Sequence, residues 1–205
     1  MSKGADAIIA LYQRHAGAFA AQRNTTLIER PWLECFLSHL PAGGQVLDLG
    51  CGFGQPIARY LLDQGCGVTG VDTSGPMIAM ARRDLPEGEW IEADMRGLDL
   101  KRRFDGVLAW NSSFHLKCDD QRALFDVFAR HTRPGGVLMF TTGPDAGEVV
   151  GSFEGEALYH ASLNPDDYRD LLRSHGFEPI ATPQVRDTDA NRLVWLARRM
   201  EANAP

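Results

Sequence analysis

Apolar and polar positions along the chain predict strands followed by helices. An apolar run over 46–49 leads into the turn Gly50-Cys51-Gly52-Phe53-Gly54, and a helical stretch follows over 57–62. A second apolar run over 67–71 ends at Asp72. A strand that passes through a glycine turn into a helix is the crossover unit of nucleotide-binding sheets. The pattern therefore predicts an α/β protein.

Two regions depart from this alternation of strand and helix. In the first, residues 4–40, four residues recur at helical spacing and predict one apolar helix face: Ile8, Tyr12, His15 and Phe19. In the second, glycines and short alternating pieces over 143–163 predict a hairpin or flap.

The last part of the chain predicts an antiparallel pair of strands. Residues 178–185 and 191–199 have strand character, and they are joined by a short connection over 186–190. So short a connection allows an antiparallel hairpin but no parallel crossover.

The glycine turn after the first strand predicts a ligand at the start of the helix. Gly50, Gly52 and Gly54 permit a sharp turn and close approach of a ligand to unpaired backbone N–H groups, which favour polar or anionic partners. A dinucleotide fingerprint would place a third glycine at position 55, where this chain has Gln55. Binding of a dinucleotide pyrophosphate is therefore disfavoured.

The run Asp48-Leu49-Gly50-Cys51-Gly52-Phe53-Gly54 resembles motif I of the class I S-adenosylmethionine-dependent methyltransferases. Further segments resemble that family in the same order: 89–95 its third strand, 104–111 its fourth, the Pro-Gly-Gly strand 133–141 its fifth, and 166–172 its last helix. The resemblance implies a Rossmann-like three-layer sandwich with a mostly parallel seven-stranded sheet, an antiparallel terminal hairpin and N-terminal helices as a lid. We expect one domain over 1–205, with a helical cap over 1–40, a core over 44–199 and the flap over 143–163.

The same resemblance implies which residues hold the cofactor S-adenosylmethionine and its product S-adenosylhomocysteine. Asp72 would accept the ribose hydroxyls, Asp94 the adenine amino group, and Asp48 would help to hold the amino group of the methionine moiety. A carboxylate at the end of the second strand also occurs in nicotinamide enzymes, so Asp72 alone does not discriminate. The full expected set is Asp48, Gly50, Cys51, Gly52, Asp72, Thr73, Asp94, Met95 and Asn111.

The loop after the fourth predicted strand is the place to seek acceptor chemistry. His115 is the candidate general base, because the pKa of an ordinary imidazole lies near working pH. Asn111 is a candidate to orient the acceptor or contact the cofactor. The alternatives remain open that His115 packs structurally and that Asn111 only forms a turn.

Residues from the predicted cap and flap complete the expected acceptor pocket. Helices ahead of the first strand often cover the site in the resembled family, and Arg30 belongs to the candidates there. For each residue, ordinary packing is the competing explanation. The expected pocket residues are Tyr12, His15, Phe19, Trp32, Phe114, His115, Tyr159 and His160.

Composition limits the other classes of function. The 205 residues are 44% hydrophobic and carry a net charge of −6, without a basic block. This disfavours nucleic acid and anionic membranes as partners, and we expect a cytoplasmic protein. The four cysteines contain no C-x-x-C pair, so neither a metal site nor a disulfide framework is expected.

The sequence thus predicts a methyltransferase that transfers a methyl group by in-line displacement to a small-molecule acceptor. Asn111-Ser112-Ser113-Phe114 does not match the Asn/Asp-Pro-Pro-Tyr/Phe motif of the family's amino-methylating branches, which favours a small molecule over nucleic acid or protein. The alternatives are a NAD-dependent oxidoreductase and a non-catalytic S-adenosylmethionine-binding module. The acceptor and the oligomeric state stay undetermined.

Overall fold

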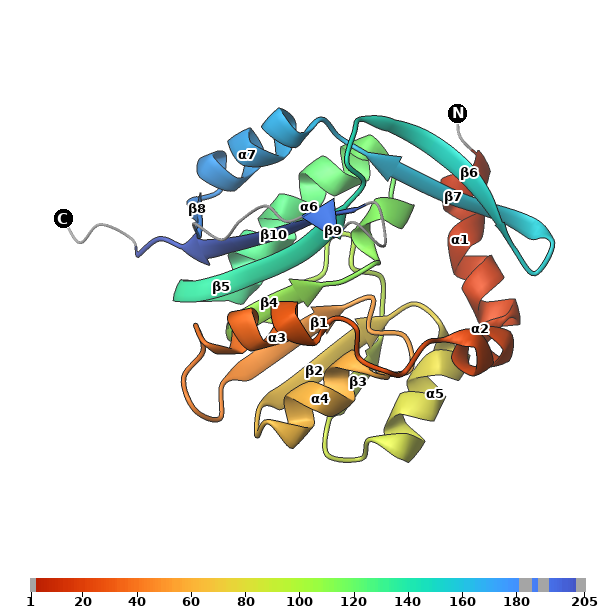
Figure 1. The fold of residues 1–205 in the computed structure, drawn as a ribbon, viewed down its shortest axis with the longest axis horizontal. Helices are drawn as coiled ribbons and strands as arrows, with labels where there is room; N and C mark the ends of the chain where they lie inside the picture. Colours follow the sequence, from red (N-terminus) through yellow and green to blue (C-terminus); the bar gives the residue numbers. More distant parts are fainter. Residues whose placement is uncertain (1–2, 181–185, 188–191, 202–205) are drawn as a thin grey trace.

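A central β-sheet organises the protein, whose computed structural model describes residues 3–180, 186–187 and 192–201. The strand order is β3-β2-β1-β4-β5-β10-β8, as Figure 1 shows. The first five of these strands run parallel to one another. Their bounds are β1 (Gln45–Leu49), β2 (Gly67–Asp72), β3 (Glu89–Glu92), β4 (Phe104–Ala109) and β5 (Thr132–Thr142).

The end of the chain forms the antiparallel part of the sheet. β10 (Arg192–Arg199) lies between β5 and β8 (Phe177–Pro179) and runs antiparallel to both, which confirms the predicted terminal pair. The predicted connection over 186–190 is partly wrong, because β9 (Arg186–Asp187) pairs with β10. The remaining predicted hairpin residues, 181–185 and 188–191, lie outside the described residues.

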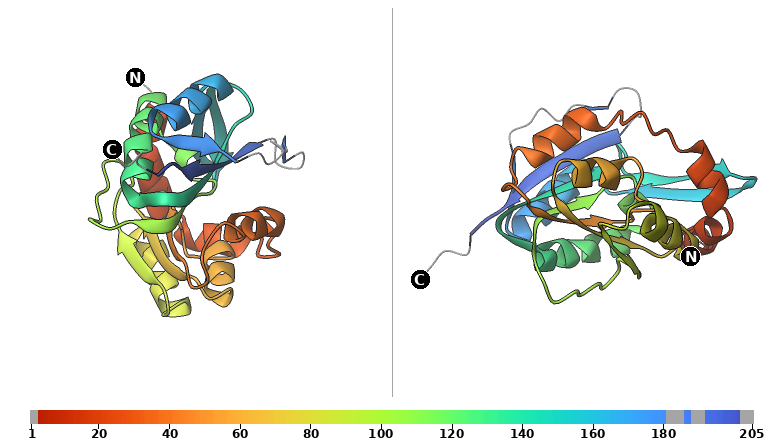
Figure 2. Two further views of the ribbon diagram at one scale, coloured as in Figure 1. Left: turned by 90° about the vertical axis from the view of Figure 1, so that its left-hand side faces the viewer. Right: turned by 90° about the horizontal axis from the view of Figure 1, so that it is seen from below.

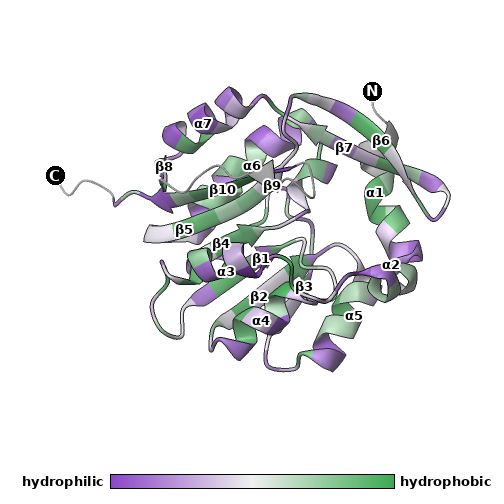
Figure 3. Ribbon diagram, in the orientation of Figure 1, coloured by the Kyte–Doolittle hydropathy of each residue, from purple (hydrophilic) through white to green (hydrophobic). Residues whose placement is uncertain are grey.

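Helices cover both faces of the sheet because successive strand side chains point to opposite sides (Figure 2). Val46 and Leu108 belong to the core beneath α3 (Arg30–Leu37), α4 (Ile57–Asp63) and α5 (Gly75–Asp84). Their neighbours Leu47 and Val107 belong to the core beneath α6 (Cys118–His131) and α7 (Pro165–Ser174). Figure 3 shows that hydrophobic residues are concentrated in these strands. The two cores form the three-layer sandwich that the sequence predicts.

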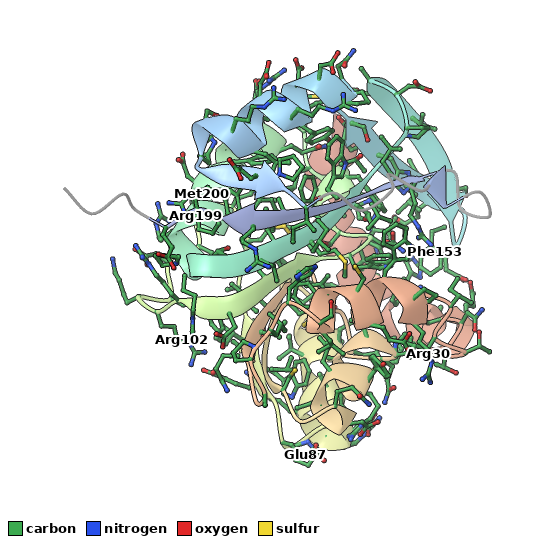
Figure 4. All side chains as sticks on the ribbon, turned by 60° about the vertical axis from the view of Figure 1, so that its left-hand side comes forward. Arg30, Glu87, Arg102, Phe153, Arg199 and Met200 are labelled. Atoms are coloured by element: carbon green, nitrogen blue, oxygen red, sulfur yellow. The ribbon has the colours of Figure 1, made fainter. Side chains whose placement is uncertain are left out.

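A second, two-stranded sheet lies beyond one end of the main sheet. β6 (Gly147–Phe153) and β7 (Glu156–Ser162) form the antiparallel hairpin predicted within 143–163, and β7 lies beside α1 (Lys3–Arg14) (Figure 1). At its tip, the Phe153 ring packs 6.2 Å from that of Phe19 on α2 (Ala16–Gln22) (Figure 4). Glu156 accepts hydrogen bonds from Arg14 and lies 2.6 Å from His15 Nε2. The hairpin and the N-terminal helices therefore form one roof.

None of the helices in the described part of the chain combines the length and the apolar character needed to cross a membrane.

Candidate active site

A cavity of about 840 Å³ opens at the carboxyl ends of the parallel strands, below the roof of α1, α2 and the hairpin. Open α/β sheets bind their ligands at this edge, and the volume is that of a small-molecule site. All nine residues that the sequence associates with the cofactor line it, namely Asp48, Gly50, Cys51, Gly52, Asp72, Thr73, Asp94, Met95 and Asn111.

The glycine turn after β1 interlocks with the turn after β4. Gly50 has φ +75°, and a Cβ atom there would lie 2.3 Å from Cβ of Ser112. The Ser112 hydroxyl donates a 2.6 Å hydrogen bond to the carbonyl of Leu49. Only glycine combines this φ with the absence of a side chain, so the two turns hold the cavity floor at a fixed spacing.

Asp72, at the end of β2, orients the glycine turn through backbone hydrogen bonds. One carboxylate oxygen accepts from Gly52 N–H at 2.9 Å and the other from Ser74 N–H at 2.8 Å. Burial raises the pKa of Asp72, and these backbone donors oppose the rise. Each carboxylate oxygen has two lone pairs, so both can accept a further hydrogen bond from a ligand in the cavity.

Asp48 is a buried carboxylate without a hydrogen-bond donor among the residues that the structure describes. The residue is 4% exposed and lines the cavity. Burial and the charge of Asp72 raise its pKa to about 7, and Arg23 lowers it. A buried acceptor without a partner is unfavourable, so this position suits a ligand that brings an N–H donor or a positive charge.

The third strand ends sooner than the sequence suggests. β3 stops at Glu92, so Asp94 and Met95 lie in the following loop, where both line the cavity. Arg96 donates to both oxygens of Asp94, with its Nη2 atom 2.6 Å from Oδ2. Burial acts to raise the pKa of Asp94, but the hydrogen bonds from Arg96 outweigh it and lower that pKa. The Asp94 carboxylate is therefore ionised at neutral pH.

Asn111 lines the cavity from the turn after β4 and has an uncommon backbone conformation. Its φ is +51°, and its N–H donates to the hydroxyl of Thr141 at 2.8 Å. Its side-chain oxygen accepts from Arg192 Nη1 at 2.8 Å, so its amide NH₂ is the part left for a ligand. A non-glycine residue held at positive φ is strained, and such residues cluster at functional sites.

His115 lies in a short 3₁₀ helix, Ser113–His115, with both ring nitrogens engaged. Nδ1 lies 2.9 Å from the carbonyl of Tyr159, which can only accept, so Nδ1 carries the proton. Nε2 therefore accepts from the Tyr12 hydroxyl, 3.1 Å away. Burial lowers the pKa of His115 to about 4. His115 thus links α1 to the hairpin and has no unoccupied nitrogen for an acceptor.

Five of the predicted pocket residues line the cavity: Tyr12, Phe19, Phe114, His115 and His160. The structure corrects the placement of the other predicted residues and of Arg30. His15 turns to Glu156 on the hairpin, and the Tyr159 side chain is fully buried beside Ile8 while its carbonyl meets His115. On α3, Trp32 packs against the core and Arg30 lies over the Tyr60 ring. These side chains pack against other residues or pair with them, and none of them lines the cavity.

Sequence reasoning missed two arginines that line the cavity. Arg23 follows α2 and forms a 2.7 Å ion pair with the buried Glu29. Arg192 begins β10 and lies over the Trp110 ring, 5.3 Å from its centre. The position of Arg192 at the start of the antiparallel strand could have predicted its place in the cavity, because that end of β10 lies beside the carboxyl end of β5.

Known proteins resemble this chain in both sequence and fold. Residues 46–136 match the family described as "Methyltransferase domain". Malonyl-[acyl-carrier protein] O-methyltransferase of Enterobacter lignolyticus is 38% identical over 118 residues, which cover 56% of this chain and 46% of that protein. The chain resembles the class I S-adenosylmethionine-dependent methyltransferases in sequence over this part and in fold. The family resemblance that the sequence predicts is thus confirmed.

Two further similarities show how varied the acceptors of related methyltransferases are. A dTDP-3-amino-3,6-dideoxy-alpha-D-glucopyranose N,N-dimethyltransferase of Streptomyces fradiae is 37% identical over 49% of this chain and 40% of its own length. The fold matches Burkholderia thailandensis 1,6-didemethyltoxoflavin-N1-methyltransferase with a TM-score of 0.73 at 22% identity, over 98% of this chain and 92% of that one. The chain spans less than half the length of the two curated relatives.

Proposed function

We propose that this chain binds S-adenosylmethionine and transfers its methyl group to a small molecule. The observation that carries the proposal is the arrangement of Asp48 and Asp72 around the glycine turn. One carboxylate is buried without a hydrogen-bond donor among the described residues, and the other keeps acceptor capacity at the end of β2. S-adenosylmethionine brings an ammonium group, a sulfonium and two ribose hydroxyls, which are the partners that such carboxylates need.

In this proposal, each cavity residue binds the part of the cofactor that the family resemblance assigns to it. Asp72 would hold the ribose hydroxyls and Asp48 the ammonium group. Asp94 would accept from the adenine amino group, and Met95 would pack beside the ring. The bound cofactor would supply an electrophilic methyl carbon, so the protein's contribution is to align the acceptor and to exclude water.

The acceptor would occupy the end of the cavity below the hairpin. Tyr12 on α1, Phe114 after β4 and His160 on β7 all pack against the His115 ring there, so three separate segments line the space. A small molecule suits a cavity of this volume. The known relatives act on a carrier-bound malonyl group, an amino sugar and a didemethyltoxoflavin, and we extend from them only the small-molecule class.

Calorimetric titration tests the proposal without knowledge of the acceptor. We expect S-adenosylhomocysteine to bind with one site per chain and NADH not to bind. The exposed variant Asp170→Asn, on the outer face of α7, should bind S-adenosylhomocysteine like the parent. Binding of NADH alone, or of neither ligand by a folded protein, would overturn the proposal in favour of an oxidoreductase or a protein without this cofactor.

A further inference from the structure

Two histidine side chains meet at the acceptor end of the cavity, and their surroundings differ. The ring of His160 on β7 lies 4.8 Å from that of His115 and 5.2 Å from that of Phe114. His115 is buried with both nitrogens engaged, whereas His160 is half-buried and lines the cavity. No hydrogen bond or ion pair joins the His160 ring nitrogens to any residue of the described ranges. His160 thus presents an imidazole that has no protein partner there.

Apolar side chains line the cavity that His160 also lines. Val149 is directly opposite His160 in the hairpin register, so the two side chains share one face of the hairpin. Ile9 on α1 and Leu116 after β4 line the same cavity. These apolar residues suit an acceptor with an aromatic or aliphatic framework. Besides His160 and the residues proposed for the cofactor, the ionisable groups that line the cavity are Tyr12, Arg23, Arg96, His115, Asp120, Asp145 and Arg192.

We propose that His160, and not His115, removes the proton from the acceptor, and that the acceptor is an apolar molecule with a hydroxyl group, of the phenol class. This inference rests on the proposed function. The acceptor's O–H bond breaks and its proton goes to a ring nitrogen of His160. The same oxygen forms a bond to the methyl carbon as the methyl–sulfur bond breaks, and that bond's electron pair stays on sulfur. The imidazolium then releases the proton to solvent.

The protonation states of the two histidines agree with this division of roles. Burial lowers the pKa of His160 below the ordinary 6.5, so its ring is neutral and able to accept a proton at neutral pH. The lower pKa of His115, about 4, makes it the weaker base. His115 is instead a positioning residue, because it holds the Tyr12 hydroxyl and the Tyr159 carbonyl.

Nitrogen-15 NMR of the histidine rings tests the assignment independently of activity. We expect His115 to remain the Nδ1–H tautomer from about pH 5 to about pH 8, and His160 to titrate below about 6.5. His160→Gln and His115→Gln assign the two signals. A His160 ring that is protonated at neutral pH, or locked in a single tautomer by a hydrogen bond, would overturn the proposal.

The rate of methylation of a series of substituted phenols then tests the base. The pKa values of these phenols range from near neutral to about 10. His160→Gln should slow the least acidic phenols by about 100-fold or more but hardly affect those already ionised. His115→Gln should slow all phenols by a similar factor. Val150→Thr, an exposed change on the same hairpin, should resemble the parent.

Three results would contradict this inference. One is equal slowing of every phenol by His160→Gln. A second is a dependence on phenol pKa that appears with His115→Gln. The third is turnover of carboxylates but of no phenol by a protein that binds S-adenosylhomocysteine. Because that binding is measured separately, each of these results would leave the proposed cofactor class intact.

Discussion

Replacement of Asp48 by asparagine should make the folded protein more stable but weaken its binding of the cofactor. The folded protein raises the pKa of this carboxyl from 3.8 to about 7, chiefly by burial. The folded state therefore binds a proton more tightly than the unfolded state, and stability falls as pH rises from about 4 to about 7. Above that range the ionised carboxylate costs about 4 kcal/mol of folding free energy.

Asp48→Asn removes this charge but keeps the size of the side chain. A buried amide without partners costs about 1–3 kcal/mol, so the variant should be more stable than the parent by about 1–3 kcal/mol at about pH 8.5. Near pH 5 the two proteins should be of similar stability. As the pH rises from about 5 to about 8.5, the free energy of unfolding of the parent should fall by about 2.5 kcal/mol more than that of the variant.

Urea denaturation at both pH values measures this difference, and calorimetry with S-adenosylhomocysteine measures the affinity. Loss of a charged hydrogen bond to the ammonium group should weaken binding by about 10- to 100-fold. Asp170→Asn, on the exposed face of α7, is the matched control for the charge change. An unchanged pH dependence of unfolding, or unchanged affinity in the Asp48 variant, would refute the reasoning.

Three further changes test other parts of the site. Asp72→Asn should weaken S-adenosylhomocysteine binding by about 30-fold or more in calorimetry, because charged acceptors for the ribose are lost; parental affinity would contradict this role. Gly50→Ala should lower the free energy of unfolding by about 1–3 kcal/mol, and Gly50→Ala with Ser112→Gly should recover part of that loss, since the 2.3 Å clash is gone while the strain at φ +75° remains. An additive double variant in denaturation would argue against the interlocked turns. Glu156→Gln should speed hydrogen exchange in the hairpin but not in β4 or β5, because the carboxylate that Arg14 and His15 contact is lost; equal exchange in both proteins would show that this contact does not hold the roof.

The sheet and the residues that line the cavity at the ends of β1 and β2 were predictable because their signals are local. Asp48, Gly50 and Gly52 belong to one strand and turn, and the apolar run before Asp72 marks the end of the next strand. Parallel strands bring their carboxyl ends to one edge, so these short segments meet even though they are far apart in the sequence. The short connection near the end of the chain likewise predicted an antiparallel pair of strands, which β8 and β10 form.

The acceptor end was less predictable because its geometry depends on distant contacts. His115 is paired with Tyr12 across 103 positions and with Tyr159 across 44, and no local pattern reports such pairs. Helical spacing identified the apolar face of the first helices but not that His15 turns to Glu156. The presence of a histidine in the loop after β4 therefore suggested a general base. Only the hydrogen-bond partners seen in the structure distinguish His115 from His160.

A crystal structure of the S-adenosylhomocysteine complex would test the central claim most directly. The account predicts ribose hydroxyls on the Asp72 carboxylate, the amino group near Asp48, and the sulfur facing the space between Asn111 and His160. S-adenosylhomocysteine bound elsewhere, or with its sulfur turned away from that space, would contradict the assignment of this cavity as a methyl-transfer site.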